Sequence, residues 1–437
     1  MCGISGIISL DKKPIKDLKS KILLMDRLLY HRGPDYSGVY INKKKTFGLS
    51  NNRLSIVAPR ENVKLPFSKN NQYYLSFNGE IYNYELIKKN LHSESGIDFK
   101  TKTDTEVLFE YLKKYKCNNL QKLNGMWSFA FYNEKKHHLT LSRDLLGERH
   151  LFYLVEDNKL YFSSEVKPIL HVSDKEKNID EDSLIESWKY NSCAPGKTLI
   201  KDVFRLEPGT NLDVLNSKIK RKKHTKFNIN TWSNFFKKKP ALEKVFDKFE
   251  KILTKEIELR IPKDVQFYNT LSGGIDSSIL TYVTNKIEPN LTKSIYVISG
   301  KNQIKKHNGI SELELSKLVS KKFKIKHSVI NSNPKKFVLN SVKKITKNSF
   351  EGCIDSNQIN FIAISNYLKR KKIKVVLMSE GPDEFLSGYL TDIEAAKVDE
   401  IYLNMIKSKK TFNQSNFKKK LNSLKLKKLK DYEITYS

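Results

Sequence analysis

The alternation of apolar and polar positions divides the chain into two regions with different expected structures. Residues 1–210 carry short β-rich runs separated by Gly, Asn or Asp, a pattern typical of strands joined by turns. The runs are GISGIISL, QYYLSFNGEIYN, WSFAFYN, HLTLSRD and KLYFSSE. Helical spacing lies between them, as in TDTEVLFEYLKKY, which begins with an N-cap signal. This mixture predicts a layered α+β domain.

The pattern changes in the second half of the chain. Residues 211–240 are polar and lysine-rich and end at Pro240, so we expect a linker there. In 241–437 the strand-like runs DVQFYNTL, KSIYVIS and IKVVLMS alternate with helical segments such as ALEKVFDKFEKILTKEIELRI. Strands that alternate with helices predict βαβ units and a parallel α/β sheet.

Length and charge narrow the class of protein. A chain of 437 residues favours two domains. The net charge of +32 includes lysine runs at 218–226 and 417–430 that could bind nucleic acid, acidic lipid or an acidic partner. Because lysine is dispersed along the chain and no nucleic-acid-binding motif accompanies it, we do not expect nucleic acid to be the main partner.

Membrane and disulfide signals are absent from the sequence. No apolar run approaches the roughly 20 residues of a membrane span, and the N-terminus has no secretory pattern. We therefore expect a cytoplasmic protein without a membrane span. The four cysteines lie far apart without a CxxC pair, which argues against a disulfide framework or a zinc site.

Cys2 has an unusual position, directly after the initiator methionine in MCGISG. Removal of Met1 would give Cys2 both a thiol, with an ordinary pKa of about 8.5, and a free α-amine, with one of about 7.7–8.0. The amine can then accept the thiol proton, so that base and nucleophile belong to one residue. This is the arrangement of an N-terminal nucleophile.

Seven motifs follow Cys2 in order: HRGPDYSG, RLSIV, FNGEIYN, TDTE, NGMWSFAFY, SRDLLGERHLFY and SSEVKPIL. Together they resemble the glutamine-hydrolysing domain of the class II amidotransferases over nearly all of residues 1–210. The resemblance implies an αββα N-terminal-nucleophile fold and a thiol that attacks the side-chain amide of glutamine. Its implied glutamine-binding residues are Arg53, Ile56, Asn78, Gly79, Glu80 and Asp104.

The resemblance also implies separate roles for these residues. Asn78 and Gly79 would stabilise the oxyanion, Arg53 would hold the glutamine carboxylate, and Glu80 and Asp104 would bind its α-ammonium group. Each signal also has a simpler interpretation. Asn-Gly is a strong hairpin-turn signal, and the charged residues could lie on the surface.

A second motif, LSGGIDSS (271–278), lies between a predicted strand and a predicted helix. Glycines and serines at such a turn leave backbone N–H groups available for phosphate at a helix N-terminus. Asp276 would repel phosphate unless Mg²⁺ lay between them. The pattern resembles the ATP pyrophosphatase loop, and the alternative is a plain glycine-rich turn.

The acidic string SEGPDEFLSGY (379–389) follows another predicted strand and resembles an element of the asparagine synthetases. The resemblance implies that Asp383 joins Asp276 in binding Mg²⁺ and that Glu380 lies beside the acceptor and ammonia as a catalytic residue. The motif SELELSKLVSKKFKIKH places Glu312 and His327 at a similar family spacing. The implied ATP-binding residues are Leu271, Ser272, Gly273, Gly274, Asp276, Ser277, Val297, Met378 and Ser379.

The whole chain thus resembles the glutamine-hydrolysing asparagine synthetases, in a C-terminally shortened form. The resemblance implies ATP and Mg²⁺ as cofactors and an aspartyl-adenylate that ammonia from the Cys2 site converts to asparagine. Three departures stand out: MSEG where the family has SGEG, GERHLFY where it commonly has GIKPLYY, and the end at Ser437 without an EARVPFLD-like segment.

Three alternatives therefore stay open. The acceptor is another carboxylate, of a sugar acid or a natural product, or the shortened chain retains only glutaminase activity. In the third, the chain is a non-catalytic or partner-dependent protein, in which a homodimer or a partner chain completes the second domain or that domain serves only as a scaffold.

Overall fold

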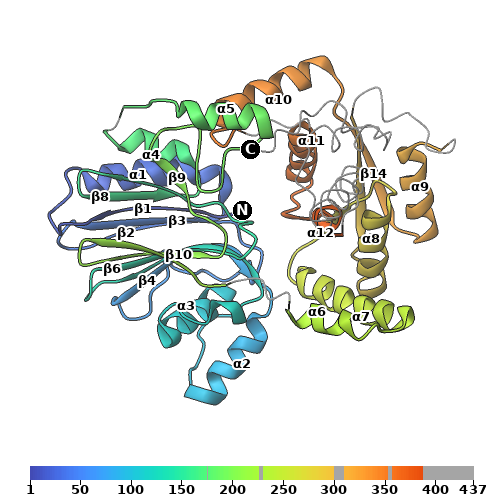
Figure 1. Cartoon of the computed structure of the whole chain (residues 1–437), viewed down its shortest axis with the longest axis horizontal. Helices are drawn as coiled ribbons and strands as arrows, with labels where there is room; N and C mark the ends of the chain where they lie inside the picture. Colours follow the sequence, from blue (N-terminus) through green and yellow to red (C-terminus); the bar gives the residue numbers. More distant parts are fainter. Residues whose placement is uncertain (175, 226–229, 300–309, 353–356, 387–437) are drawn as a thin grey trace, which may run out of the picture.

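The computed structural model describes residues 1–174, 176–225, 230–299, 310–352 and 357–386. Two groups of sheets are separated along the long axis of the molecule (Figure 1). The two sheets of the first domain are antiparallel, and the single sheet of the second is parallel, as the alternation of strands and helices there predicts.

The first domain contains a six-stranded sheet in the order β2-β3-β1-β8-β7-β9. Its middle strand β1 pairs antiparallel with β3 and β8, so the residue after Cys2 begins a buried central strand. The strands are β1 (Gly3–Ser9), β2 (Tyr36–Ile41), β3 (Phe47–Arg53), β7 (Phe152–Glu156), β8 (Lys159–Ser163) and β9 (Val203–Arg205).

The second sheet of this domain has the order β11-β10-β6-β5-β4. Its longest strands, β4 and β5, pair antiparallel over nine residues each. The strands are β4 (Tyr73–Ile81), β5 (Gly125–Asn133), β6 (His138–Arg143), β10 (Thr210–Leu215) and β11 (Lys218–Lys223).

Helices cover the outer faces of both sheets (Figure 1). The helices α1 (Leu18–Leu29) and α4 (Val166–Val172) share a core with the six-stranded sheet, whereas α2 (Tyr84–Ser95) and α3 (Asp104–Tyr115) share one with the five-stranded sheet. A third core, which includes the stacked rings of Phe47 and Tyr132, lies between the sheets. The predicted αββα layering is confirmed. Short 3₁₀ turns at η1 (Tyr30–Arg32) and η2 (Leu120–Lys122), and α5 (Glu181–Tyr190), complete the domain.

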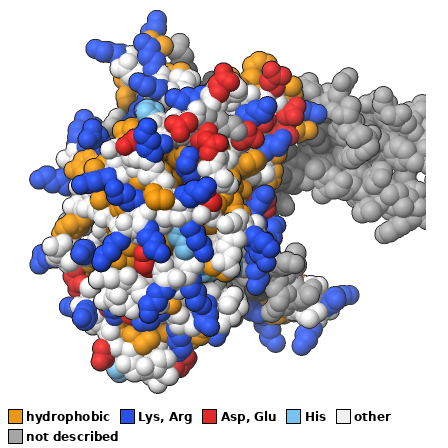
Figure 2. Space-filling view, turned by 90° about the vertical axis from the view of Figure 1, so that its left-hand side faces the viewer, with side chains coloured by type: hydrophobic (Ala, Val, Ile, Leu, Met, Phe, Trp, Pro, Cys, Tyr) orange, Lys and Arg blue, Asp and Glu red, His pale blue; other side chains and the backbone are white. Residues whose placement is uncertain are grey.

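The sheet extends into the range expected to be a linker. Strands β10 and β11 occupy most of 210–223, and β10 pairs with β6. The sequence signal was weak because β11 is an exposed edge strand that reads KIKRKK. Charged residues on an edge strand discourage pairing with another chain. On the face drawn in Figure 2, Lys and Arg side chains are spread widely and do not gather into one patch.

The second domain has four parallel strands in the order β14-β13-β12-β15. The chain leaves β12 toward β13 on one side and returns to β15 on the other, so β12 and β15 meet at the switch point where α/β sheets bind ligands. The strands are β12 (Phe267–Thr270), β13 (Lys293–Ile298), β14 (Lys326–Asn331) and β15 (Val375–Leu377).

Seven helices of the described residues accompany this sheet. The helix α8 packs on α7, and α11 contacts β13 and β14. The helices are α6 (Asn230–Lys237), α7 (Leu242–Arg260), α8 (Ile275–Ile287), α9 (Glu312–Lys322), α10 (Lys335–Asn348), α11 (Asn357–Arg370) and α12 (Pro382–Leu386). Among the described residues, no helix has both the length and the apolar character that crossing a membrane requires.

Candidate active site

Cys2 lies half-buried immediately before β1, and its sulfur is held at the end of β3. The backbone N–H of Leu54 donates to Cys2 Sγ at 3.3 Å. Burial raises the pKa of the Cys2 thiol above its ordinary value. With Met1 attached, the thiol is therefore protonated at neutral pH, and it needs a base to become nucleophilic.

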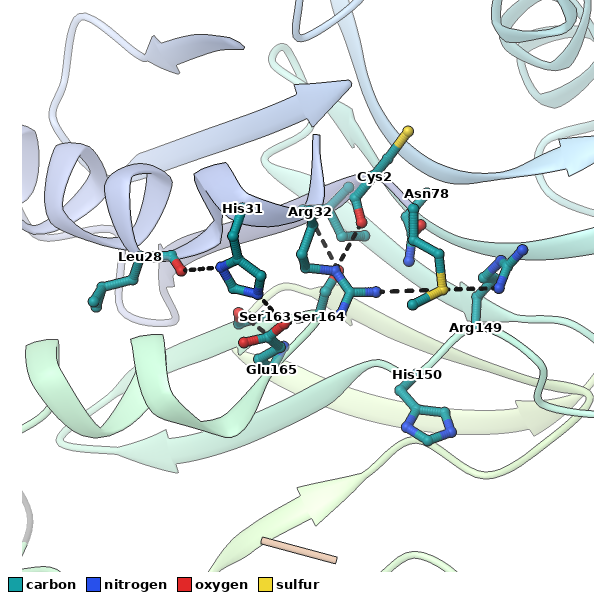
Figure 3. Close-up of polar contacts among 12 residues, drawn as sticks. Cys2, Leu28, His31, Arg32, Asn78, Arg149, His150, Ser163, Ser164 and Glu165 are labelled. Carbon is teal, nitrogen blue, oxygen red and sulfur yellow. Dashed lines mark hydrogen bonds and ion pairs between the residues drawn. The ribbon is translucent and has the colours of Figure 1, made fainter. Parts of the chain in front are cut away.

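The backbone of Cys2 is fixed by a charged cluster. Arg32 Nε donates to the carbonyl oxygen of Cys2 at 2.9 Å, and Arg32 Nη1 pairs with Glu165 Oε1 at 2.9 Å. His31 Nε2 contacts the same carboxylate oxygen. Figure 3 shows the Cys2 sulfur directed away from this cluster. The cluster therefore holds the main chain and leaves the thiol available.

Asn78 and Gly79 lie inside β4, opposite Ser128 and Trp127 of β5. The hairpin-turn interpretation of FNGEIYN is therefore wrong, because β4 continues in its ladder through both residues. Asn78 is fully buried, and its Nδ2 donates to Ser128 Oγ at 3.3 Å. An amide nitrogen carries two hydrogens, so the second one is left for a ligand. A Cβ on Gly79 would collide with the Met126 carbonyl oxygen, which explains the glycine.

Arg53 ends β3 and is almost fully buried. Its Nη1 donates to the Glu61 carbonyl at 3.1 Å and its Nη2 to the Val57 carbonyl at 2.9 Å. These bonds fix the plane of the guanidinium without neutralising its charge. The remaining N–H groups can bind a carboxylate. Ile56 lies half-buried in the loop that supplies these carbonyls.

Two acidic residues have strongly raised pKa values next to this arginine. Burial and the nearby Asp104 raise the pKa of Glu80 to about 7. Burial raises the pKa of Asp104 to about 6, although the Ile81 N–H donates to its Oδ2 at 3.2 Å and Arg53 opposes the shift. Buried carboxyl groups with raised pKa values favour a cationic ligand that restores their charge.

Electrostatic interactions show that these charged residues and the Cys2 thiol belong to one site. Asp104 and Arg53 both act on the charge of Cys2, and Asp104 acts on Glu80. The site therefore presents one buried cation, two acids and a thiol on elements from both sheets. This arrangement complements a zwitterion that carries a reactive side chain.

The glycine-rich motif of the second domain forms the predicted strand-to-helix turn. Gly273 has a φ of +87°, and a Cβ there would lie 2.6 Å from Leu315 Cβ. Gly274 is the N-cap of α8. Ser272 Oγ accepts from the Gly274 N–H at 3.3 Å and lies 3.0 Å from Ser277 Oγ. Leu271 is buried and pairs with Ile295 through its N–H. Such a turn at a helix N-terminus suits a phosphate.

Two carboxylates from different strand ends approach each other beside this turn. Burial and repulsion from Asp383 and Glu384 raise the pKa of Asp276. Such mutual repulsion is relieved by a divalent cation, and Mg²⁺ commonly uses one or two carboxylates together with phosphate oxygens. No set of three or more His, Cys, Asp or Glu side chains in the described residues could hold a metal ion. The repulsion between Asp276 and Asp383 is of the kind that a divalent cation bound together with nucleotide phosphates would relieve.

The remaining predicted residues of this domain lie around the same strand ends. Val297 is half-buried near the end of β13, and Met378 and Ser379 follow β15 half-buried. Glu380 is exposed one residue later.

Glu312 and His327 form hydrogen bonds within the domain, and His327 lies near the start of β14, away from the carboxyl ends of the strands. His327 uses both ring nitrogens on Ser294 Oγ and Ser316 Oγ, and Glu312 accepts from the Tyr296 hydroxyl.

Contacts between the domains involve residues that the sequence analysis did not assign. Lys374 Nζ, at the start of β15, donates to Asp35 Oδ2 at 2.7 Å and to the Ser55 carbonyl at 3.2 Å. The Ser55 N–H donates to the same Asp35 oxygen. Glu351 forms a second contact with His150 and Arg205. Asp35 and Glu165 lie in motifs noted above, but their charged partners are more than 100 residues away, so spacing gave no signal.

Comparison with known families identifies both domains. Residues 1–225 match the glutamine amidotransferase domain family, and residues 248–434 match the asparagine synthase family. The two-domain fold and the site thus define an amidotransferase joined to a synthase domain. The chain belongs to the asparagine synthase-type glutamine amidotransferases, as the resemblance in the sequence predicted.

Similar curated proteins carry related names. Asparagine synthetase [glutamine-hydrolyzing] 1 of Bacillus subtilis is 29% identical over 89% of this chain and 59% of its own length. Asparagine synthetase B [glutamine-hydrolyzing] of Escherichia coli is 25% identical over 92% of this chain and 67% of its own. Amidase chry2 of Gibberella zeae is 25% identical over 89% and 59%. The chain thus spans about three fifths to two thirds of these three relatives.

The raised pKa values of Glu80 and Asp104 predict a pH-dependent affinity for glutamine. Ionisation of either group is unfavourable in the empty folded site, so stability falls as pH rises through the range below about 7. An ammonium group reverses this penalty. Isothermal titration of the Cys2→Ala variant should therefore show glutamine affinity rising from pH 5.5 to 7.5.

A matched variant identifies the groups that titrate. Glu80→Gln should remove the step near pH 7 and leave the step near pH 6. An affinity for glutamine that does not change with pH in Cys2→Ala would contradict the assignment of the acids.

Proposed function

We propose that the chain hydrolyses glutamine at Cys2 and uses the ammonia to amidate a carboxylate activated by ATP, with aspartate as the leading acceptor. The observation that carries the proposal is the set of charges around the thiol. Arg53 suits the α-carboxylate of glutamine, and Glu80 and Asp104 suit its α-ammonium group. The side-chain amide of glutamine then extends toward Cys2.

Removal of Met1 would provide the base for the thiol. Burial, with Arg32 and Arg149 nearby, lowers the pKa of the Met1 α-amine to about 6. The α-amine of Cys2, once exposed, would lie one residue further along, directly before the buried strand β1. A neutral amine there can accept the thiol proton at pH 7 and return it to the leaving ammonia.

The first reaction balances as an ordinary acyl transfer. The Cys2 thiolate attacks the amide carbon, and the oxyanion accepts hydrogen bonds from the Asn78 Nδ2 and the Gly79 N–H. Such donors act on charge that develops only in the tetrahedral intermediate. Ammonia leaves, a thioester forms, and water releases glutamate and restores the thiol.

The second reaction would take place at the ends of β12 and β15. The carboxylate of the acceptor attacks the α-phosphorus of ATP, and pyrophosphate leaves. Ammonia then attacks the acyl-adenylate to give the amide and AMP. Mg²⁺ held by Asp276 and Asp383 would offset the negative charge of the phosphates. The turn at 272–277 would hold phosphate oxygens through backbone N–H groups.

Glu380 would act beside the acceptor, and its place after β15 supports this role. Val297, Met378 and Ser379 border the same strand ends. Aspartate is favoured by the names of two of the relatives. Another carboxylate stays the alternative, since a similar protein is named an amidase.

A product assay tests the proposal. Wild-type protein given glutamine, aspartate and Mg-ATP should form glutamate, AMP, pyrophosphate and asparagine. Cys2→Ala should lose glutamine hydrolysis by a factor of about 10⁴ or more, because it removes the nucleophile, and it should retain amidation with ammonium chloride. Glutamine hydrolysis by Cys2→Ala would contradict the proposal. AMP release with another carboxylate, but not with aspartate, would favour the alternative acceptor.

The Lys374 contact predicts coupling between the two reactions. Its ion pair with Asp35 is partly buried, with side-chain exposures of 30% and 26%. The loss of about 1 kcal/mol of contact would weaken domain docking about fivefold. Lys374→Met should therefore raise the ratio of glutamate to amide product, because more ammonia escapes to water. The exposed Lys372→Met is the control. Equal ratios in both variants would show that Lys374 does not couple the domains.

A further inference from the structure

The two halves of the proposed glutaminase centre belong to different sheets. Cys2 precedes β1 of the six-stranded sheet, and the oxyanion donors Asn78 and Gly79 lie in β4 of the five-stranded sheet. Backbone ladders fix each half within its own sheet. They do not fix the spacing between the sheets, which side chains must set.

Asn51 of β3 is a side chain that spans this spacing. It is 2% exposed and therefore shielded from water. Its Nδ2 lies 3.1 Å from the Gly3 carbonyl and 3.4 Å from the Phe77 carbonyl. Its Oδ1 accepts from the Phe77 N–H at 3.1 Å.

Both contacted residues are next to the reacting groups. Gly3 directly follows Cys2, and Phe77 directly precedes Asn78. The Asn51 amide thus donates to a carbonyl oxygen of β1 and also to one of β4. Its oxygen accepts from a backbone N–H of β4. A buried amide with donor and acceptor both paired is a strong and directional link, because leaving either end unpaired is costly.

We infer that Asn51 is a positioning residue of the glutaminase reaction, which sets the distance between the Cys2 thiol and the oxyanion donors. The inference rests on the proposed function for its catalytic consequence. Asn51 does not touch glutamine in this account. It acts by keeping the backbone at Gly3, which follows the nucleophile, at a fixed distance from the backbone at Phe77, which precedes the oxyanion donor.

The chemistry of this position requires a carboxamide. Leucine has the same branched arrangement of side-chain heavy atoms but leaves the Phe77 N–H and the Gly3 carbonyl unpaired. Aspartate retains an acceptor for the Phe77 N–H, but it places a negative charge against two carbonyl oxygens. Either change should let the two strands shift relative to each other.

Ser76 offers a control that distinguishes the positioning role of Asn51 from a general contribution to packing between the sheets. Ser76 Oγ donates to the Ser50 carbonyl at 3.1 Å, so it links the same two strands and is fully buried. Neither Ser50 nor Ser76 adjoins Cys2 or Asn78 in the sequence. Ser76→Ala therefore removes one contact between the sheets without releasing the peptides that flank the reacting groups.

Steady-state glutamine hydrolysis by the full chain tests the catalytic consequence. Asn51→Leu and Asn51→Asp should lower kcat about 10²-fold, the cost of a misplacement of about 1 Å. KM for glutamine should change little, since Arg53, Glu80 and Asp104 are intact. Ser76→Ala should retain kcat. A kcat of the wild-type size in both Asn51 variants would overturn the inference, as would an equal loss in Ser76→Ala.

Hydrogen–deuterium exchange provides a second measurement that does not depend on turnover. Asn51→Leu should speed exchange in the peptides covering residues 2–4 and 76–79 together, while exchange in the distant α3 stays as in wild type. Unchanged exchange in both peptides would overturn the inference. If the wild-type protein hydrolyses no glutamine, the proposed function fails, and the exchange result still decides whether Asn51 ties the two strands.

Discussion

The proposed glutaminase site depends on holding a half-buried thiol among charges that would match a zwitterion. The Leu54 N–H and the Arg32 guanidinium fix Cys2 at the place where β1 begins and β3 ends. Arg53, Asp104 and Glu80 surround it from two sheets and a helix. Burial makes each charge costly without a ligand, which is why both acids have raised pKa values. In the proposed function, the same burial would let the site select a ligand that brings the opposite charges.

The second constraint concerns ammonia, which becomes a non-nucleophilic ammonium ion when it reaches water at neutral pH. Two domains that exchange ammonia must therefore stay in contact. Contacts at several places connect them here, among them Lys374 with Asp35 and Glu351 with His150 and Arg205. Asp264 also accepts from the Ala58 N–H, and Glu256 accepts from the Asn124 amide. Lys374 also contacts the carbonyl oxygen of Ser55, and Ser55 directly follows Leu54, whose N–H donates to the Cys2 sulfur. The segment Leu54–Ser55 therefore takes part both in the docking of the domains and in the positioning of the thiol.

Much of this arrangement was predictable from local patterns. The helix at 104–115, its Thr103 cap and the main strands follow from periodicity and capping signals. The layered domain and the family followed from the order of the motifs. Strands β10 and β11 were not predicted, because they lie in the range expected to be a linker, and the lysine-rich edge strand β11 resembles one. The roles of Asn51, Glu165 and Lys374 were not predicted either, since each depends on a partner distant in sequence. Tertiary contacts determine such roles, and local sequence does not report them.

The most direct test of the account is covalent labelling of the full chain with an electrophilic glutamine analogue such as a diazoketone, followed by mass spectrometry of the N-terminal peptide. The account predicts a peptide that begins at Cys2, lacks Met1 and carries one adduct on the sulfur, with excess glutamine slowing the labelling. Cys117 and Cys193 are buried and should remain unlabelled. A mature chain that retains Met1, or labelling that bypasses Cys2, would contradict the central claim.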